Sequence, residues 1–327
     1  MTTFNQLQKS LSSDKIPFNK QTVLDQINKK GIYKTEECTI KKWEGDEQNA
    51  QMYIANMKYD DLNFIGILNG LFERDGCCLN EFPNGDLYFG YYSSDIKSKH
   101  GLYTFNPEIT ETSLSQEMYF GYWEDDQRQG RGINLWVNQP NNINLFHDFD
   151  LLNLNAIIGE FDKGKPKKAT ILSKDGNDYF CYHGTFTSNG AKAGNKCFYY
   201  SATQEKLLFG EFAVNKFEGG FCALFNDEGE ISEISKLEKG KVYKESEINE
   251  NEVMSKKEIM SNFRNIILGK DYFEQLVHCF QVVLNFRDKY MIDIDVLNSE
   301  KYIDIMSISL SYLKVGIYKD IEKYLKY

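Results

Sequence analysis

Apolar and polar residues alternate with a period of two in several stretches of this chain, and each stretch is built around a glycine. In YFGYWE (119–124), the side chains of Tyr119, Gly121 and Trp123 fall on one face of an extended strand, and the residues between them fall on the other. A polar run, DDQRQG, follows, and then GINLWV, which is rich in residues that suit a pleated surface. The pattern predicts a β-hairpin.

The pattern occurs six times in all. Its central glycines are Gly66, Gly90, Gly121, Gly159, Gly184 and Gly210, and two positions after each comes Leu68, Tyr92, Trp123, Phe161, Phe186 or Phe212. Two of the spacings between these glycines are longer, and they contain residues 107–117 and 138–155. Insertions between similar units map to loops, so we expect loops there, serving either as binding loops or as tolerated decorations.

The glycines need a physical reason, because a glycine in mid-strand normally weakens pairing. We expect the aromatic ring of a neighbouring unit to lie over Gly121, and Gly130 and Gly132 to supply positive φ or close packing after the turn. A phosphate cradle is the weaker interpretation, because a helix should follow the glycines and the residues after Gly132 are strand-like. One hairpin is marginal in water, whereas six in series pair into an elongated sheet.

The pattern Y-x-G-x-aromatic, a polar run, then G-x-G resembles the MORN repeat. YFGYWEDDQRQGRGINLW fits it almost position by position, FPNGDLYFGYY (82–92) resembles its link between units, and the resemblance covers residues 64 to about 225. Thr170, Lys196, Cys77 and Phe221 stand where the pattern places its last glycine. The repeat-defining positions on this resemblance are Gly66, Tyr88, Gly90, Tyr92, Gly101, Tyr119, Gly121, Trp123, Gly130, Gly132, Gly159, Phe161, Gly184, Phe186, Gly210 and Phe212.

The resemblance implies a curved, single-layer β-meander whose relatives are mostly scaffolds. Some relatives belong to the ciliary axoneme, notably radial-spoke heads, and others to junctions between membrane and cytoskeleton. The expected fold is therefore β-rich plus α: an elongated antiparallel meander of about six hairpins, followed by a small C-terminal helical region.

The flanks divide the chain into four parts. Residues 1–62 form an N-terminal cap, in which KQTVLDQINKKG predicts a short helix closed by Gly31 and IYKTEECTIKKWEG predicts strands. Residues 63–225 are the meander, and residues 226–254 are a charged connector. Residues 255–327 carry apolar stripes at helical spacing, namely Ile259, Phe263, Ile266, Phe273, Leu276, Phe280 and Val283, then Met306, Leu310, Leu313, Ile317 and Ile321.

Composition narrows the function classes. The net charge of −10 disfavours nucleic-acid binding by the surface as a whole. Seven cysteines without a CxxC pair disfavour a disulfide framework or a zinc site. The first 20 residues have no apolar signal core, so a cytoplasmic or cytoskeletal location is expected.

Catalytic signatures are not found in the sequence. The four histidines form no HxxxH or HExxH pattern, and no GxSxG or Walker motif occurs. Asp125 and Asp126 fall in an expected solvated turn rather than in a desolvated catalytic pair. We therefore expect no catalytic residue, no bound metal and no cofactor.

Three functional hypotheses follow. The first is a non-enzymatic scaffold that assembles with other proteins, a second MORN protein or a second copy, in a ciliary or flagellar axonemal complex such as a radial spoke. The second is a membrane- or phosphoinositide-binding module that uses the basic cluster Lys163, Lys165, Lys167 and Lys168. The third is an enzyme whose site the sequence does not reveal.

Overall fold

The computed structural model describes residues 19–42, 52–59, 62–106, 108–109, 113–140, 154–175, 178–226, 231–248 and 261. The helical region expected at 255–327 falls outside these residues, apart from Ser261.

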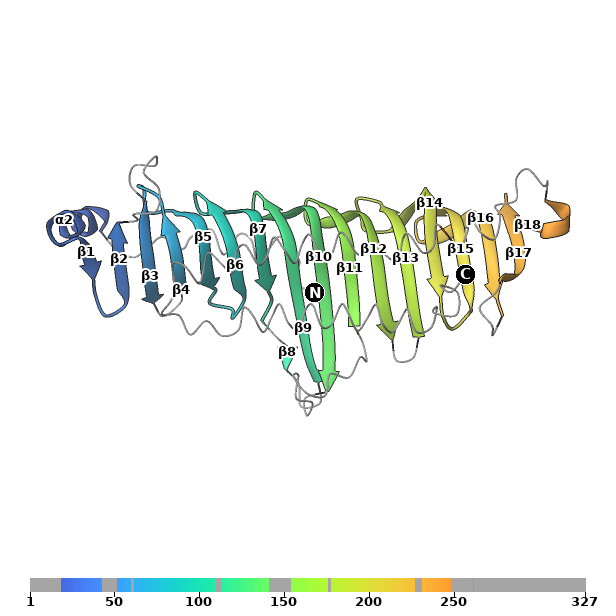
Figure 1. Ribbon diagram of the computed structural model, residues 1–327, viewed down its shortest axis with the longest axis horizontal. Helices are drawn as coiled ribbons and strands as arrows, with labels where there is room; N and C mark the ends of the chain where they lie inside the picture. Colours follow the sequence, from blue (N-terminus) through green and yellow to red (C-terminus); the bar gives the residue numbers. More distant parts are fainter. Residues whose placement is uncertain are drawn as a thin grey trace.

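The described residues form one open antiparallel sheet, a β-meander with a short helix at its N-terminal end (Figure 1). Each strand pairs with the next along the chain, except that β7 pairs directly with β9 and the two-residue β8 also lies along β9. The elements are α2 (Lys20–Lys30), β1 (Ile32–Lys34), β2 (Cys38–Lys42), β3 (Tyr53–Tyr59), β4 (Leu62–Leu68), β5 (Arg74–Glu81), β6 (Leu87–Ser93), β7 (Ile96–Thr104), β8 (Glu108–Ile109), β9 (Ser113–Glu124), β10 (Gln127–Pro140), β11 (Leu154–Asp162), β12 (Lys165–Asp175), β13 (Asp178–Phe186), β14 (Lys192–Ser201), β15 (Lys206–Ala213), β16 (Lys216–Phe225), β17 (Ile231–Glu238), β18 (Lys241–Lys244) and the 3₁₀ turn η1 (Glu245–Glu247).

Two-residue turns close five of the hairpins along one rim of the sheet. Both residues of each turn have positive φ, as type I′ turns require: Ser94–Asp95, Asp125–Asp126, Lys163–Gly164, Val214–Asn215 and Lys239–Gly240. The prediction that Asp125 and Asp126 lie in a hairpin turn is confirmed. We call the edge formed by these turns, together with the turn at 69–73, the turn rim; it is the upper edge in Figure 1.

The register assigns every strand residue to one of two faces. Cross-strand partners share a face, so Gly121, Gly132 and Gly159 lie on one side and Phe120, Ile133 and Ile158 lie on the other. We call the first side the glycine face and the second the apolar face.

The helix α2 forms where the sequence predicted a short helix. The side chain of Asn19 caps its start by accepting from the backbone N–H groups of Gln21 and Thr22, and Gly31 ends it with φ of +77°. Val23 and Ile27 pack into the apolar cluster on the glycine face. The helix therefore covers the N-terminal end of the sheet, where a bare edge would invite aggregation.

Two segments differ from expectation. Residues 231–244, expected to belong to a charged connector, form β17 and β18 and continue the sheet. The long spacers are not simply loops either, because residues 113–117 pair with residues 136–140 and make β9 and β10 the longest strands of the described sheet. In Figure 1 this pair extends beyond its neighbours on the rim opposite the turns.

Candidate interaction surface

A continuous row of small residues crosses the glycine face. Cross-strand partners in β4 to β16 place one such residue on nearly every strand, and Cys197 follows Gly184 across a bulge in β14. The row, in strand order, is Gly66, Cys78, Gly90, Gly101, Gly121, Gly132, Gly159, Ala169, Gly184, Cys197, Gly210 and Gly220. We call it the glycine row. The sequence interpretation placed four of its second-strand members one residue away from the row. Cys77 and Lys196 lie one residue before the row members Cys78 and Cys197, and Thr170 and Phe221 lie one residue after Ala169 and Gly220.

The aromatic rings that lie over Gly90, Gly121 and Gly184 come from the same strand, not from a neighbouring unit as expected. The Tyr119 ring lies over Gly121 and Gly132, and its hydroxyl donates a 3.1 Å hydrogen bond to the carbonyl of Tyr122. Tyr88 and Tyr182 repeat this arrangement, with hydroxyl bonds of 2.9 and 3.0 Å to the carbonyl three residues later. The Tyr88 and Tyr119 rings can lie flat because the two row positions beneath each of them are glycines.

In two units the second-strand glycine lies directly beneath a tyrosine ring and leaves no room for a larger residue. A Cβ built on Gly132 would come within 2.6 Å of the Tyr119 ring atom Cζ, and the same clash exists at Gly101 beneath Tyr88. Where the chain has Ile157 instead of tyrosine, the second-strand position is Ala169, which carries a Cβ. The tyrosine therefore explains the second glycine in two units, at Gly101 and Gly132. The unit of Tyr182 differs, because its second-strand position is Cys197, whose sulfur lies 3.2 Å from the Tyr182 hydroxyl.

Replacing Gly132 with alanine is expected to lower the free energy of unfolding by about 1–3 kcal/mol, because the new methyl overpacks against the Tyr119 ring. On a Tyr119→Ile background the same substitution should cost much less, since that pair then copies Ile157 above Ala169. Urea denaturation of the four chains of this cycle measures the coupling. Equal costs on both backgrounds would contradict the explanation.

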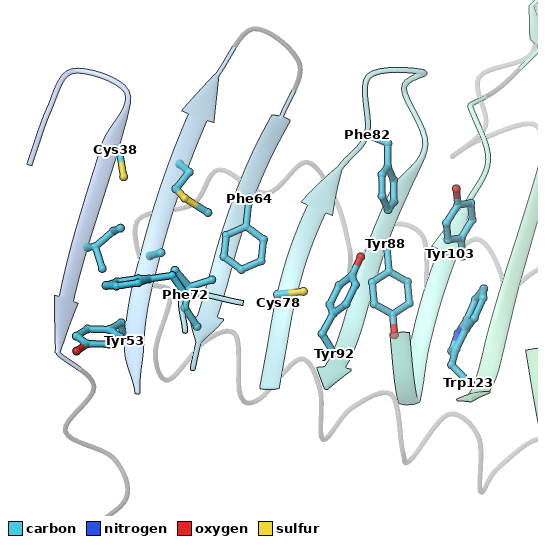
Figure 2. Close-up of a cluster of buried hydrophobic side chains, with 14 of the residues drawn as sticks. Cys38, Tyr53, Phe64, Phe72, Cys78, Phe82, Tyr88, Tyr92, Tyr103 and Trp123 are labelled. Atoms are coloured by element: carbon cyan, nitrogen blue, oxygen red, sulfur yellow. The ribbon is translucent and has the colours of Figure 1, made fainter. Parts of the chain in front are cut away.

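The other repeat-defining residues also gather on the glycine face. Trp123, Phe161 and Tyr92 join Tyr88 and Tyr119 in one buried cluster, part of which Figure 2 shows, and Phe186 and Phe212 pack with Tyr182 in a second cluster. Gly130 is the exception: it lies outside the row, with φ of +59°, next to the ring of Tyr122 on the apolar face.

Cations at the starts of second strands form a feature that the sequence interpretation missed. Arg74, Lys97, Arg128 and Lys192 each lie at or next to the first residue of β5, β7, β10 or β14, and each places its charge over one or more tyrosine rings at 4.5–5.7 Å from the ring centroids. Cations over aromatic faces are stabilised by the ring quadrupole. We call these four residues the cation ladder.

Lys97 lies among four aromatic rings. Its Nζ lies 5.6–5.7 Å from the ring centroids of Phe82, Tyr88, Tyr103 and Trp123. Asp126 Oδ1 accepts both from the Lys97 backbone N–H at 2.8 Å and from its Nζ at 3.2 Å. Burial lowers the pKa of Lys97, and the Asp126 carboxylate opposes that effect.

Side chains of the turn rim form hydrogen bonds with residues of the cation ladder in the preceding hairpin. The side chain of Asp95 accepts from the backbone N–H of Arg74 at 2.9 Å and pairs with its guanidinium at 2.8 Å. Asn215 accepts from the backbone N–H of Lys192 at 2.8 Å in the same way. Asp95, Asp126 and Asn215 thus each tie a turn to the preceding hairpin, which holds the adjacent units in a fixed relation.

The structure separates the lysines of the expected basic cluster. Lys163 belongs to a turn, while Lys165 begins β12 and its Nζ donates to the carbonyl of Ser188 at 2.7 Å. Lys167 lies at the bulge opposite Glu160 and Phe161, and Lys168 belongs to the apolar face opposite Thr185. All four are exposed, but they do not lie on one face.

The cysteine and histidine side chains of the described residues are mostly packed within the sheet and do not form a cluster that resembles a catalytic or metal site. No group of three or more histidine, cysteine or acidic residues there could hold a metal ion. Burial raises the pKa values of the Cys77 and Cys181 thiols to about 12. Burial, with Lys168 nearby, lowers the pKa of His183, whose Nδ1 lies 2.9 Å from the Thr170 hydroxyl. His147, His278 and Cys279 lie outside the described residues.

The fold and this surface together define an open β-meander protein built from repeated hairpins. Comparison with protein-family models and with curated proteins finds no match for the chain. Within the described residues, no helix is both long enough and apolar enough to span a bilayer.

Proposed function

We propose that this chain is a MORN-type repeat protein that acts as a non-enzymatic scaffold for a protein assembly. The observation that carries the proposal is the turn rim. Four of the five large apolar side chains that are exposed in the described residues lie in its turns or within two residues of them: Leu71, Ile96, Val214 and Val242. Apolar side chains spaced along a rigid edge suit contact with an extended partner.

The proposed setting is a cytoskeletal complex, and the first candidate is the ciliary axoneme. The support for this setting is the likeness of the hairpin pattern to MORN repeats. The clamped turns add a physical reason, since a platform must keep the spacing of its contact points under load. Partners are proposed to be other proteins of that assembly, a second copy of this chain included.

The test compares two tagged full-length variants in the cell that makes the protein. Ile96→Lys with Val214→Lys alters the turn rim, and lysine already occupies the Val214 position of two other turns, at Lys163 and Lys239. Thr203→Lys with Gln204→Lys adds the same charge on the opposite rim. The first variant should leave the detergent-resistant cytoskeletal fraction and lose its proximity-labelled neighbours, whereas the second should keep both.

Two outcomes would contradict the proposal. One is a wild-type chain that detergent extracts fully and that labels no cytoskeletal protein. The other is labelling of membrane proteins combined with salt-sensitive sedimentation on anionic vesicles, which would favour the basic residues Lys163, Lys165, Lys167 and Lys168.

A further inference from the structure

The apolar face carries its own row of large side chains, directly behind the glycine row. Phe89, Leu102, Phe120 and Ile133 are successive cross-strand neighbours there, and none is more than 3% exposed. The adjacent row on the same face continues toward the C-terminal strands, where Leu207 and Ile234 are each 1% exposed. Buried apolar residues thus run across the face from β6 to β17.

The strands of the sheet cannot by themselves shield these apolar side chains from solvent. On the glycine face a ring lies flat because the row beneath it has no side chain. Phe89, Leu102, Phe120 and Ile133 follow one another without a glycine, so they stand side by side on the pleat and shield only each other's flanks. Among the described elements, α2 packs on the glycine face and η1 packs mainly against β17 and β18, at the C-terminal end of the sheet. None of them covers the middle of the apolar face.

We propose that residues 255–327 lie across the apolar face as the second layer of the fold. The span from β6 to β17 is about 48 Å, at roughly 4.8 Å per strand. Residues 255–290 as a helix would be about 54 Å long at 1.5 Å per residue. Their apolar stripe, from Ile259 through Phe263 and Phe273 to Val283, gives such a helix one face to bury.

The other undescribed segments are too short for this task. The longest of them, residues 1–18, would reach about 27 Å as a helix, and residues 43–51 and 141–153 would reach less. A sheet face that carries rows of buried apolar side chains is normally covered by a second layer. The C-terminal segment alone combines the length with two stripes of helical period. If residues 255–327 cover the apolar face, the turn rim is the surface that stays open to partners. This inference does not depend on the scaffold proposal.

The test is site-specific photo-cross-linking in the full-length chain. Ile157 and Ile158 are neighbours in β11, both are half-buried, and their side chains point to opposite faces. A photoreactive phenylalanine analogue at position 158 should cross-link within one chain to peptides of residues 255–327. The same analogue at position 157 is the matched control, and it should give a several-fold smaller yield of those peptides.

Three results would overturn the proposal. The first is equal yields from positions 157 and 158. The second is cross-linking from position 158 to another segment of the chain. The third is cross-linking between chains that falls away on dilution, which would assign the apolar face to a second copy. Should the analogue at position 158 unfold the chain, half-buried Phe209 on the same face replaces it, with Leu208 as its control.

Discussion

Replacing Trp123 with alanine is expected to lower the free energy of unfolding by about 3–5 kcal/mol, the cost typical of removing a large buried aromatic side chain. The Trp123 side chain is 2% exposed, and its Nε1 donates a 3.1 Å hydrogen bond to the carbonyl of Gly101 on the preceding unit. Its ring packs edge-on against Tyr88 and Tyr119, at centroid distances of 5.6 and 5.2 Å. Trp123 therefore joins two hairpins rather than stabilising one.

That position predicts a change in cooperativity as well as in stability. In a chain of repeats, total stability is close to a sum of unit terms and terms for contacts between neighbours. Losing the Trp123 contacts weakens one neighbour term, so urea denaturation followed by circular dichroism should become broader or split into two steps. The control is Tyr122→Ala, one residue earlier on the apolar face and 37% exposed, which should cost about 1 kcal/mol. Similar losses in both variants would contradict the proposed role of Trp123.

The hairpin repeat could be predicted from the sequence because its signal is local. A glycine, an aromatic two positions later and a polar pair fix a strand, its inward face and a turn within a few residues, as at Gly121, Trp123 and Asp125. The source of the covering ring was predicted wrongly, although the sequence holds the signal. Tyr119 and Gly121 are two residues apart and so must share a face, which places the ring of the same strand nearest to the glycine.

The end of the sheet was missed for a different reason. Residues 231–244 are rich in charge, and charge density was interpreted as a connector. Strands at a sheet edge have few neighbours, so they need few apolar residues, and lysine there discourages further pairing. The Lys239–Gly240 turn repeats Lys163–Gly164, and that likeness was the available signal. The cation ladder could not be predicted from the sequence, because only the strand register shows which aromatic rings lie around each of its cations.

Reversing the charge of Lys97 is expected to be among the most damaging single substitutions in the described sheet. Glutamate at this position would face the carboxylate of Asp126 and the negative faces of four rings, with no partner for its charge. A charge left without a partner in a buried position typically costs about 3–5 kcal/mol, and the Lys97 side chain is only 13% exposed, although that of Asp126 is 38% exposed. Urea denaturation should show a loss of that order for Lys97→Glu.

Two companion variants separate the causes of that loss. Lys97→Met keeps the aliphatic stem and removes the cation, so it should cost about 1–2 kcal/mol, the worth of a desolvated cation over aromatic rings. Asp126→Asn should cost about 1 kcal/mol alone, because an amide oxygen can keep the backbone clamp, as Asn215 does to Lys192, while the loss of a carboxylate that is 38% exposed removes a partly solvated charge partner of Lys97. Combined with Lys97→Glu, it should recover the part of the loss that comes from like-charge repulsion. If Lys97→Glu and Lys97→Met are equally stable, the rings interact with the aliphatic part of the Lys97 side chain and not with its charge. The cation ladder would then stabilise the sheet by packing alone.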